Sequence, residues 1–114
     1  MEDCVFCQIA KGEGPADVVY EDDISVAFKD INPQAPVHIL VIPKKHIRTM
    51  LDVTEEDAAL IGNLFRVTNK IAGEKNLSNS GFRLVINTGS QSGQSVWHIH
   101  IHLIGGRKMT WPPG

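Results

Sequence analysis

Short runs of apolar, mostly β-branched residues recur along the chain, and residues that favour turns bound each run. Glu21-Asp22-Asp23 separates the first two runs, which predicts a tight hairpin. Pro33, Pro36 and Pro43 cannot donate a ladder hydrogen bond, so they mark a loop and a strand end. The strands expected from this pattern cover residues 18–20, 24–28, 38–42, 82–87 and 96–104.

A different periodicity begins at Thr54 and continues to about Ala72. Apolar residues spaced three or four positions apart predict one face of a helix, and they are Leu60, Leu64, Val67 and Ile71. Thr54 is a candidate N-cap and Gly73 a candidate stop. One long helix among five strands predicts an α+β fold, with a mostly antiparallel sheet and the helix covering one face.

Length and composition indicate one domain over residues 1–114, since 42% of the residues are hydrophobic and 21% are charged. The net charge of -2 argues against a general binder of nucleic acid or of anionic membranes. The acidic start at Met1 lacks the basic region of an export signal, and no apolar run reaches the roughly 20 residues that a membrane span needs. We therefore expect a cytoplasmic protein.

The strongest chemical signal is the alternation of histidines with apolar residues between positions 98 and 102. Because side chains alternate across a strand, His98, His100 and His102 are expected on one face, about 7 Å apart in succession. A solvated polar face is the simplest explanation, but other polar residues would serve such a face equally well. Two chemical interpretations stay open: the imidazoles could bind a catalytic metal, or one could be a nucleophile while another moves protons.

The segment from Gly89 to Ser95 consists of small and amide residues and directly precedes these histidines. Such a run would more often be only a turn if it stood alone. Its backbone N–H groups and hydroxyls could also hold a phosphate, and the neighbouring histidines favour that interpretation.

Cys4 and Cys7 are the two cysteines, and they lie too close in sequence to brace a fold. In a chain without an expected export signal, such a pair indicates metal ligands or redox thiols. A redox pair would follow a strand and open a helix, whereas no strand is expected before Cys4. The spacing therefore favours half of a tetrahedral zinc site.

The segment from Gly93 to Leu103 resembles the signature of the histidine-triad (HIT) superfamily. Other segments that carry the resemblance are Phe6, residues 30–38, residues 43–46, residues 87–89 and residues 111–114. Gln94-Ser95 and the Trp-Pro-Pro-Gly ending resemble the Hint branch, the purine nucleoside phosphoramidate hydrolases. The resemblance implies a short N-terminal helix, a C-terminal tail over residues 105–114, and a sheet extended across a homodimer.

The resemblance also implies a mechanism. His100 would attack the α-phosphorus of a nucleoside 5'-phosphoramidate, and water would hydrolyse the resulting nucleotidyl-histidine. The carbonyl of His98 would hold the His100 ring, and His38 would orient the network. His102 would hydrogen-bond the phosphate or the leaving group, while Ser95 and loop amides would stabilise the phosphoryl charge. A departing amine needs a proton, and the ordinary pKa of imidazole suits that role.

The nucleotide contacts implied by the resemblance involve the loop after the second strand. Asp30 would accept hydrogen bonds from the ribose hydroxyls, although it could instead cap a turn. The residues expected around the purine are Phe6, Ile9, Phe28 and Ile31, each of which taken alone is more often ordinary core. The further residues expected near the phosphate are Asn87, Gly93 and Gln94.

Bacterial members of the superfamily and related uridylyltransferases imply a structural zinc ion bound by Cys4, Cys7, His46 and His98, with two free thiols as the alternative. Other functions also stay open. A dinucleoside polyphosphate hydrolase of the Fhit branch usually carries Thr where Ser95 stands, and superfamily transferases replace the last histidine by glutamine, whereas this chain has His102. A nucleotide-binding interaction module with incidental turnover and a metal-dependent hydrolase are the other candidates.

Overall fold

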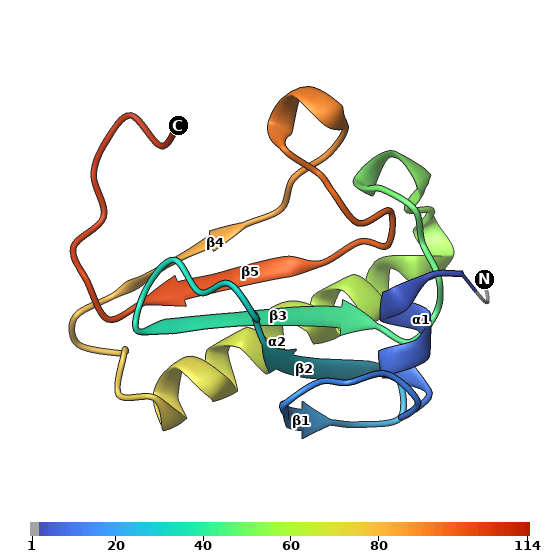
Figure 1. Ribbon diagram of the computed structural model, residues 1–114, viewed down its shortest axis with the longest axis horizontal. Coiled ribbons are helices and arrows are strands. Elements are labelled where there is room, and N and C mark those ends of the chain that lie inside the picture. The colour runs from blue at the N-terminus through green and yellow to red at the C-terminus, as the bar shows by residue number, and fades with distance from the viewer. Residues whose placement is uncertain (1–2) are drawn as a thin grey trace.

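In the computed structural model, which describes residues 3–114, five strands form one antiparallel sheet in the order β1-β2-β3-β5-β4 (Figure 1). The strands are β1 (Val18–Glu21), β2 (Ser25–Lys29), β3 (Val37–Pro43), β4 (Phe82–Val85) and β5 (Ile101–Gly105). The helices are α1 (Val5–Ala10) and α2 (Ala58–Glu74), and short 3-10 turns cover Met50–Asp52, Glu55–Asp57 and Ser90–Ser92. This architecture confirms the expected fold. The acidic start at Met1 and Glu2 lies outside the described residues.

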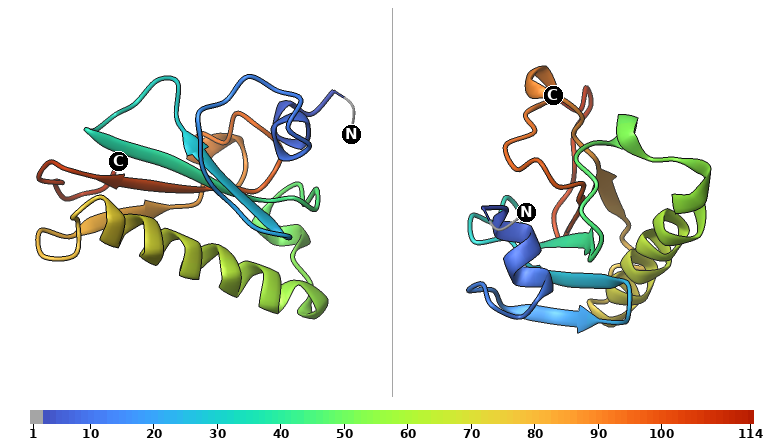
Figure 2. Two further views of the ribbon diagram at one scale, coloured as in Figure 1. Left: turned by 90° about the horizontal axis from the view of Figure 1, so that it is seen from below. Right: turned by 90° about the vertical axis from the view of Figure 1, so that its right-hand side faces the viewer.

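The sheet is covered on both faces, by α2 on one side and α1 on the other (Figure 2). Strand β3 shows how the sequence achieves this, because its side chains alternate between the two layers. Ile39 and Val41 pack with α2, whereas Leu40 and Ile42 pack with Phe6 of α1. Double coverage explains why this strand is apolar along almost its whole length.

The start and the end of α2 differ from the expected positions. Thr54 caps a 3-10 turn, in which its N–H donates to Asp57 Oδ2 at 3.1 Å, and the α-helix begins only at Ala58. The helix continues through Gly73 to Glu74. Asn76 adopts the left-handed conformation, with a φ of 62°, and it takes the place of Gly73 as the residue that ends the helix. Asparagine is the residue besides glycine that commonly ends helices in this way.

The strand expected over residues 96–104 begins only at Ile101, and β4 ends at Val85 rather than at residue 87. Before β5 the chain bends at His98 and is held by other elements. The N–H of Ile99 donates to the Ile47 carbonyl at 2.7 Å, and His98 Nε2 donates to the Pro43 carbonyl at 2.8 Å. The expectation that the three histidines share one regular strand was therefore wrong at His98 and at His100, since only His102 lies in β5.

The segment after β5 is tied to two other parts of the chain. Arg107 Nε donates to the Gln34 carbonyl at 3.0 Å, and Arg83 of β4 donates to the Thr110 carbonyl at 2.9 Å. Trp111 stays 79% exposed. Within residues 3–114, no helix is both long enough and apolar enough to span a membrane.

Candidate active site and candidate metal centre

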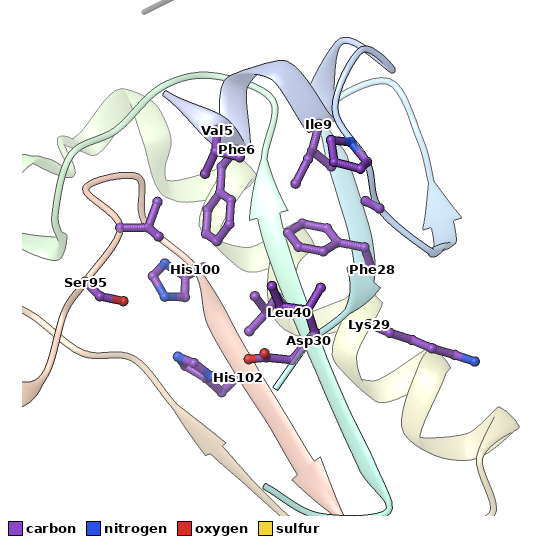
Figure 3. A pocket seen from close by; sticks show the side chains of 14 residues that line it. Val5, Phe6, Ile9, Phe28, Lys29, Asp30, Leu40, Ser95, His100 and His102 are labelled. Atoms are coloured by element: carbon purple, nitrogen blue, oxygen red, sulfur yellow. The ribbon is translucent and has the colours of Figure 1, made fainter. Parts of the chain in front are cut away.

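A cavity of about 460 Å³ opens between α1 and the face of the sheet opposite α2 (Figure 3). One end of it is apolar, and the lining residues there include Val5, Phe6, Ile9, Phe28, Ile31 and Leu40. The other end is polar, and its residues include Asp30, Ser95, His100 and His102. The cavity thus brings together most of the residues expected at the site, whereas Asn87, Gly93 and Gln94 are not among its lining residues.

Aromatic rings shape the apolar end of the cavity. Phe6 meets Phe28 edge to face, with ring centroids 5.4 Å apart, and it meets His100 in the same way at 5.1 Å. Ile31 is 96% exposed at the rim, so it is available to cover one side of a ligand. A flat apolar ring is the kind of group that such walls accommodate.

The ring of His100 is held in one tautomer. Its Nδ1 lies 2.7 Å from the His98 carbonyl oxygen, and a carbonyl only accepts, so Nδ1 carries the proton. Nε2 therefore keeps its lone pair, and no described residue hydrogen-bonds to it. Burial lowers the pKa of His100, despite the opposing effects of the carbonyl bond and of Asp30. A neutral imidazole with a free Nε2 is a nucleophile.

His102 is oriented by a chain of hydrogen bonds that begins in the loop before β3. The backbone N–H of Gln34 donates to His38 Nδ1 at 3.0 Å, so His38 carries its proton on Nε2. His38 Nε2 lies 2.9 Å from His102 Nδ1 and donates to it. His102 must then carry its own proton on Nε2. Burial lowers the pKa of His102 to about 4, so its ring is neutral near pH 7.

Asp30 follows the last residue of β2 and combines both roles that we considered for it. Its Oδ1 accepts from the backbone N–H of Asn32 at 2.8 Å, which caps the turn. Its Oδ2 lies 3.3 Å from His38 Nε2, and the residue also lines the cavity. The turn therefore fixes the carboxylate while part of it stays available to a ligand.

The loop before the histidines is braced by Gln94, which is buried. Its Nε2 donates to the carbonyls of Arg48 and Val96, at 3.0 and 3.2 Å, and its Oε1 accepts from the N–H of Gly89 at 2.9 Å. Gly93 has a φ of 96°, a conformation that favours glycine. These two residues shape the loop, and they leave Ser95 exposed at the cavity.

Four potential metal ligands meet beside α1, at the positions expected from the sequence: Cys4, Cys7, His46 and His98. Their ligand atoms lie within 4.8 Å of one another. His98 donates Nε2–H to the Pro43 carbonyl, which leaves the Nδ1 lone pair facing both sulfur atoms at 3.5 Å. Bound histidines commonly donate their second N–H to a carbonyl in this way. Two thiols and two imidazoles in this arrangement fit a tetrahedral zinc ion.

Burial shifts the pKa of two of these four groups. Burial and the neighbouring Cys4 raise the pKa of Cys7 to about 11. Burial lowers the pKa of His98 to about 4, against the opposing effect of its bond to Pro43. A bound cation would lower the pKa of Cys7 again, because it would stabilise the thiolate form of this residue.

A second cluster, formed by Asp30, His38 and His102, also has ligand atoms within 4.8 Å of one another. Its tautomers do not suit a metal, because the bond from Gln34 keeps the proton on His38 Nε2. That N–H points at the lone pair of His102 Nδ1. The cluster is therefore better described as a hydrogen-bond relay, which favours the nucleophilic interpretation of the histidines over the catalytic-metal one.

Two residues that line the cavity were not predicted, although their spacing in the sequence could have indicated them. Val5 lies four positions before Ile9, so both share a face of α1. Leu40 lies two positions after His38, so both share a face of β3. No side-chain pattern could have shown the role of Gln34, because its backbone makes the contact.

A family model described as HIT domain matches residues 11–109, and the chain belongs to this family. The chain is 54% identical, over 113 residues, to an uncharacterized HIT-like protein of Synechococcus elongatus, with 99% of this chain and 98% of that protein covered. It is also similar to the crystal structure of a HIT family hydrolase from Legionella pneumophila, with 55% identity and a TM-score of 0.97 over 98% of this chain and 100% of that one. The expected family is thus confirmed.

Two more distant structures are informative about chemistry. A histidine triad nucleotide-binding protein from Candida albicans shares 29% identity with a TM-score of 0.83, over 96% of this chain and 83% of that one. A Zn-bound histidine triad family protein from Mycobacterium smegmatis shares 34% identity with a TM-score of 0.79, over 93% of this chain and 76% of that one. The fold of this chain is therefore shared with hydrolases and with a nucleotide-binding protein of the family.

Proposed function

We propose that the protein hydrolyses purine nucleoside 5'-phosphoramidates through a nucleotidyl intermediate on His100. The observation that carries this proposal is the bond from His100 Nδ1 to the His98 carbonyl, which leaves Nε2 unprotonated beside the polar end of the cavity. Similarity to a HIT family hydrolase and to a nucleotide-binding member of the family supports the class of reaction.

The cavity suggests how the substrate binds. The purine fits the apolar end between Phe6, Phe28 and Ile31, and the ribose hydroxyls reach Asp30 at the side. The α-phosphate then lies at the polar end, within reach of the hydroxyl of Ser95 and of the imidazole of His102. Asn87 and the backbone of the loop around Gly93 are proposed to complete the phosphate site, with Gln94 holding the loop in place.

The first step exchanges one phosphorus–nitrogen bond for another. The lone pair of His100 Nε2 forms a bond to phosphorus, and the bond to the amine breaks. The amine leaves with a proton taken from solvent, while the Nε2–H of His102 donates a hydrogen bond to the phosphate or to the departing nitrogen. The His98 carbonyl stabilises the positive charge that the nucleotidylated His100 ring acquires.

The second step returns the enzyme to its starting state. Water attacks the phosphorus, while the Nε2–H of His102 donates a hydrogen bond to a phosphoryl oxygen. The bond to His100 Nε2 breaks, and its electron pair returns to the ring. The nucleoside 5'-monophosphate leaves together with one proton. His38 acts through His102 by holding its tautomer, and Asp30 stays beside both rings.

We also propose a zinc ion bound by Cys4, Cys7, His46 and His98. The ion would tie α1 to the segment that carries the His98 carbonyl, and it would supply no step of the reaction. A homodimer, a cytoplasmic location and the absence of nucleic-acid or membrane partners remain predictions from the sequence.

Mass spectrometry of protein quenched during turnover of an adenosine 5'-phosphoramidate tests the function. We expect the mass to increase by one nucleotidyl group, with fragments that locate the group on His100. The variant H100A should show no increase. Turnover without any adduct on the wild-type chain, under conditions where the second step is slowed, would contradict the mechanism.

A further inference from the structure

Cys4 and Cys7 form a pair at the start of α1 whose geometry suits a disulfide as well as a metal ion. Cys4 is the N-cap of the helix, and its Sγ accepts from the backbone N–H of Cys7 at 3.4 Å. The two sulfur atoms lie within 4.8 Å of each other. A redox pair typically opens a helix, and this pair does so, although no strand precedes it among the described residues. A small movement of the two sulfur atoms would therefore close a disulfide.

The two thiols differ in their access to solvent. Cys7 is buried, whereas Cys4 is partly exposed and lines a second cavity of about 410 Å³. Arg48 and Trp97 lie in the same wall, with the guanidinium carbon of Arg48 4.5 Å from the centroid of the Trp97 ring. A small oxidant such as hydrogen peroxide fits this space, so it would reach Cys4 before it reaches Cys7.

A disulfide and a bound metal ion exclude each other at this pair. Each sulfur binds a cation as a thiolate, and a disulfide contains no thiolate. Cys7 Sγ lies 3.2 Å from His46 Nδ1, and both sulfur atoms lie 3.5 Å from His98 Nδ1. Oxidation would leave only these two imidazoles, which are too few for a tetrahedral site. The ion would therefore leave.

Loss of the ion would reach the base end of the nucleotide cavity through α1. Phe6 lies between the two cysteines in the sequence, and its ring centroid lies 5.4 Å from that of Phe28 and 5.1 Å from that of His100. The helix has only six residues, and so short a helix depends on contacts with the rest of the chain. Without the link from α1 to His46 and His98, the cavity wall formed by Phe6 would be held less firmly.

We propose that Cys4 and Cys7 form a peroxide-sensitive switch, in which oxidation to a disulfide releases the zinc ion and weakens nucleotide binding. First, the Cys4 thiolate attacks one oxygen of hydrogen peroxide, the O–O bond breaks, and the departing hydroxide takes up a proton to become water. Next, the Cys7 thiolate attacks the sulfur of the Cys4 sulfenic acid, the S–O bond breaks, and a second hydroxide leaves and becomes water. The two sulfur atoms lose two electrons, and peroxide gains them. This inference rests on the metal centre described under the proposed function, and it uses no step of the reaction at His100.

The test treats zinc-loaded protein with hydrogen peroxide and follows three quantities. A chromogenic chelator should detect about one zinc ion released per chain. The tryptic peptide 1–11, which ends at Lys11 and contains both cysteines, should become lighter by two hydrogen masses. The Kd for AMP, measured by calorimetry, should rise about tenfold, which is the change expected if α1 is correctly placed for about a tenth of the time. A thiol reductant together with zinc should reverse all three changes.

Variants test the order of the two steps. C7S should retain the sulfenic acid on Cys4, which dimedone labels, because no second thiol removes it. C4S should be labelled far less, because Cys7 is buried. M50L, which removes a half-exposed methionine, is the matched control and should respond to peroxide as the wild type does.

The outcomes separate this switch from the proposed reaction. Zinc release without the lighter peptide, or a disulfide that leaves the Kd for AMP unchanged, overturns the switch. Stronger labelling of C4S than of C7S overturns the order of the steps. Wild-type protein that holds no zinc contradicts the metal centre, and the switch falls with it. Failure to hydrolyse a phosphoramidate contradicts the proposed reaction alone, because no measurement here uses that substrate.

Discussion

His38 Nε2 lies 2.9 Å from His102 Nδ1, and the direction of this hydrogen bond is fixed from outside the pair. The backbone N–H of Gln34 occupies His38 Nδ1, so the proton between the two rings belongs to His38. His102 is thereby held with its N–H on Nε2. A loop backbone thus decides the protonation pattern of a side chain in the cavity.

This relay predicts the behaviour of the variant H38A. Without a donor at Nδ1, His102 should populate both neutral tautomers, and kcat should fall roughly 10- to 100-fold, as is typical when a hydrogen bond that orients a functional imidazole is removed. ¹⁵N NMR shifts of the His102 ring report the tautomer directly. A single unchanged tautomer in H38A would show that His38 does not hold His102.

His100 is predicted to be indispensable for turnover. H100A should lower kcat by several powers of ten, because the nucleophile contributes to the transition state more than to binding of the ground state. Binding of AMP, measured by calorimetry, should change little, which distinguishes lost chemistry from a lost fold. H102A should also lower kcat, but by less than H100A does. The nucleophile would have to be reassigned if H100A kept most of the wild-type rate.

The metal centre predicts about one zinc ion per chain in protein purified without chelator, measured by elemental analysis. C4S should lose the ion and lower the melting temperature, because α1 would no longer be joined to His46 and His98. S78A, which removes a hydroxyl far along the chain, should leave both properties unchanged. Metal-free wild-type protein with two freely titrating thiols would contradict the site.

The neutral histidines predict that stability declines in acid. In metal-free protein, burial lowers the pKa of His98 to about 4, below the ordinary value of 6.5. The unfolded chain therefore binds a proton between pH 6.5 and 4 that the folded chain does not bind, and the free energy of unfolding falls as the pH falls through this window. His102 contributes in the same direction.

The magnitude of this effect can be measured by urea denaturation. For His98 alone, the free energy of unfolding should fall by on the order of 3 kcal/mol between pH 7 and pH 4. H102N should reduce the pH dependence, because asparagine does not titrate in this range. A free energy of unfolding that stays constant from pH 7 to pH 4 would show that these rings are not held neutral by burial.

The sequence predicted the fold because the spacing of its apolar residues matches the positions that are buried in the folded chain. Leu64, Val67 and Ile71 are spaced as a helical face requires, and all three are buried against the sheet. The end of the helix was misplaced because Gly73 tolerates the helical interior, while Asn76 supplies the left-handed residue at the true end. Such choices depend on neighbouring packing, which a local pattern does not contain.

The candidate site was predictable where side-chain types carry the chemistry. The alternation placed His100 and His102 correctly at the cavity, but it could not show that His98 lies outside the strand and turns toward the cysteines. That position depends on the bond from His98 to the carbonyl of Pro43, a contact across 55 residues. The pairing of Arg48 with Trp97 is equally invisible in the sequence, because the two residues meet only in the folded chain.

A symmetric homodimer remains a prediction, and the structure shows which exposed features favour it. β4 is an edge strand, and edges of sheets are usually covered or paired. Phe82 on β4 is 37% exposed and Phe65 on α2 is 39% exposed. Thr68 of α2 does not add to this surface, because it is fully buried and its hydroxyl donates to the Phe65 carbonyl at 2.6 Å. The two phenylalanines are therefore the residues to test.

Light scattering at micromolar concentration should give twice the chain mass of 12.5 kDa. F65E should shift the protein toward the monomer, because a charge would be buried in an isologous contact. V18E, at the opposite edge strand β1, is the matched control and should leave the mass unchanged. Trp111 is too exposed to contribute to the core of its own chain, so we expect the tail to help shape the nucleotide site of the partner chain. Deleting residues 109–114 should then change the preference among leaving amines more than it changes the melting temperature. A fully active monomer, or a deletion with unchanged kinetics on several amines, would show that each chain completes its own site.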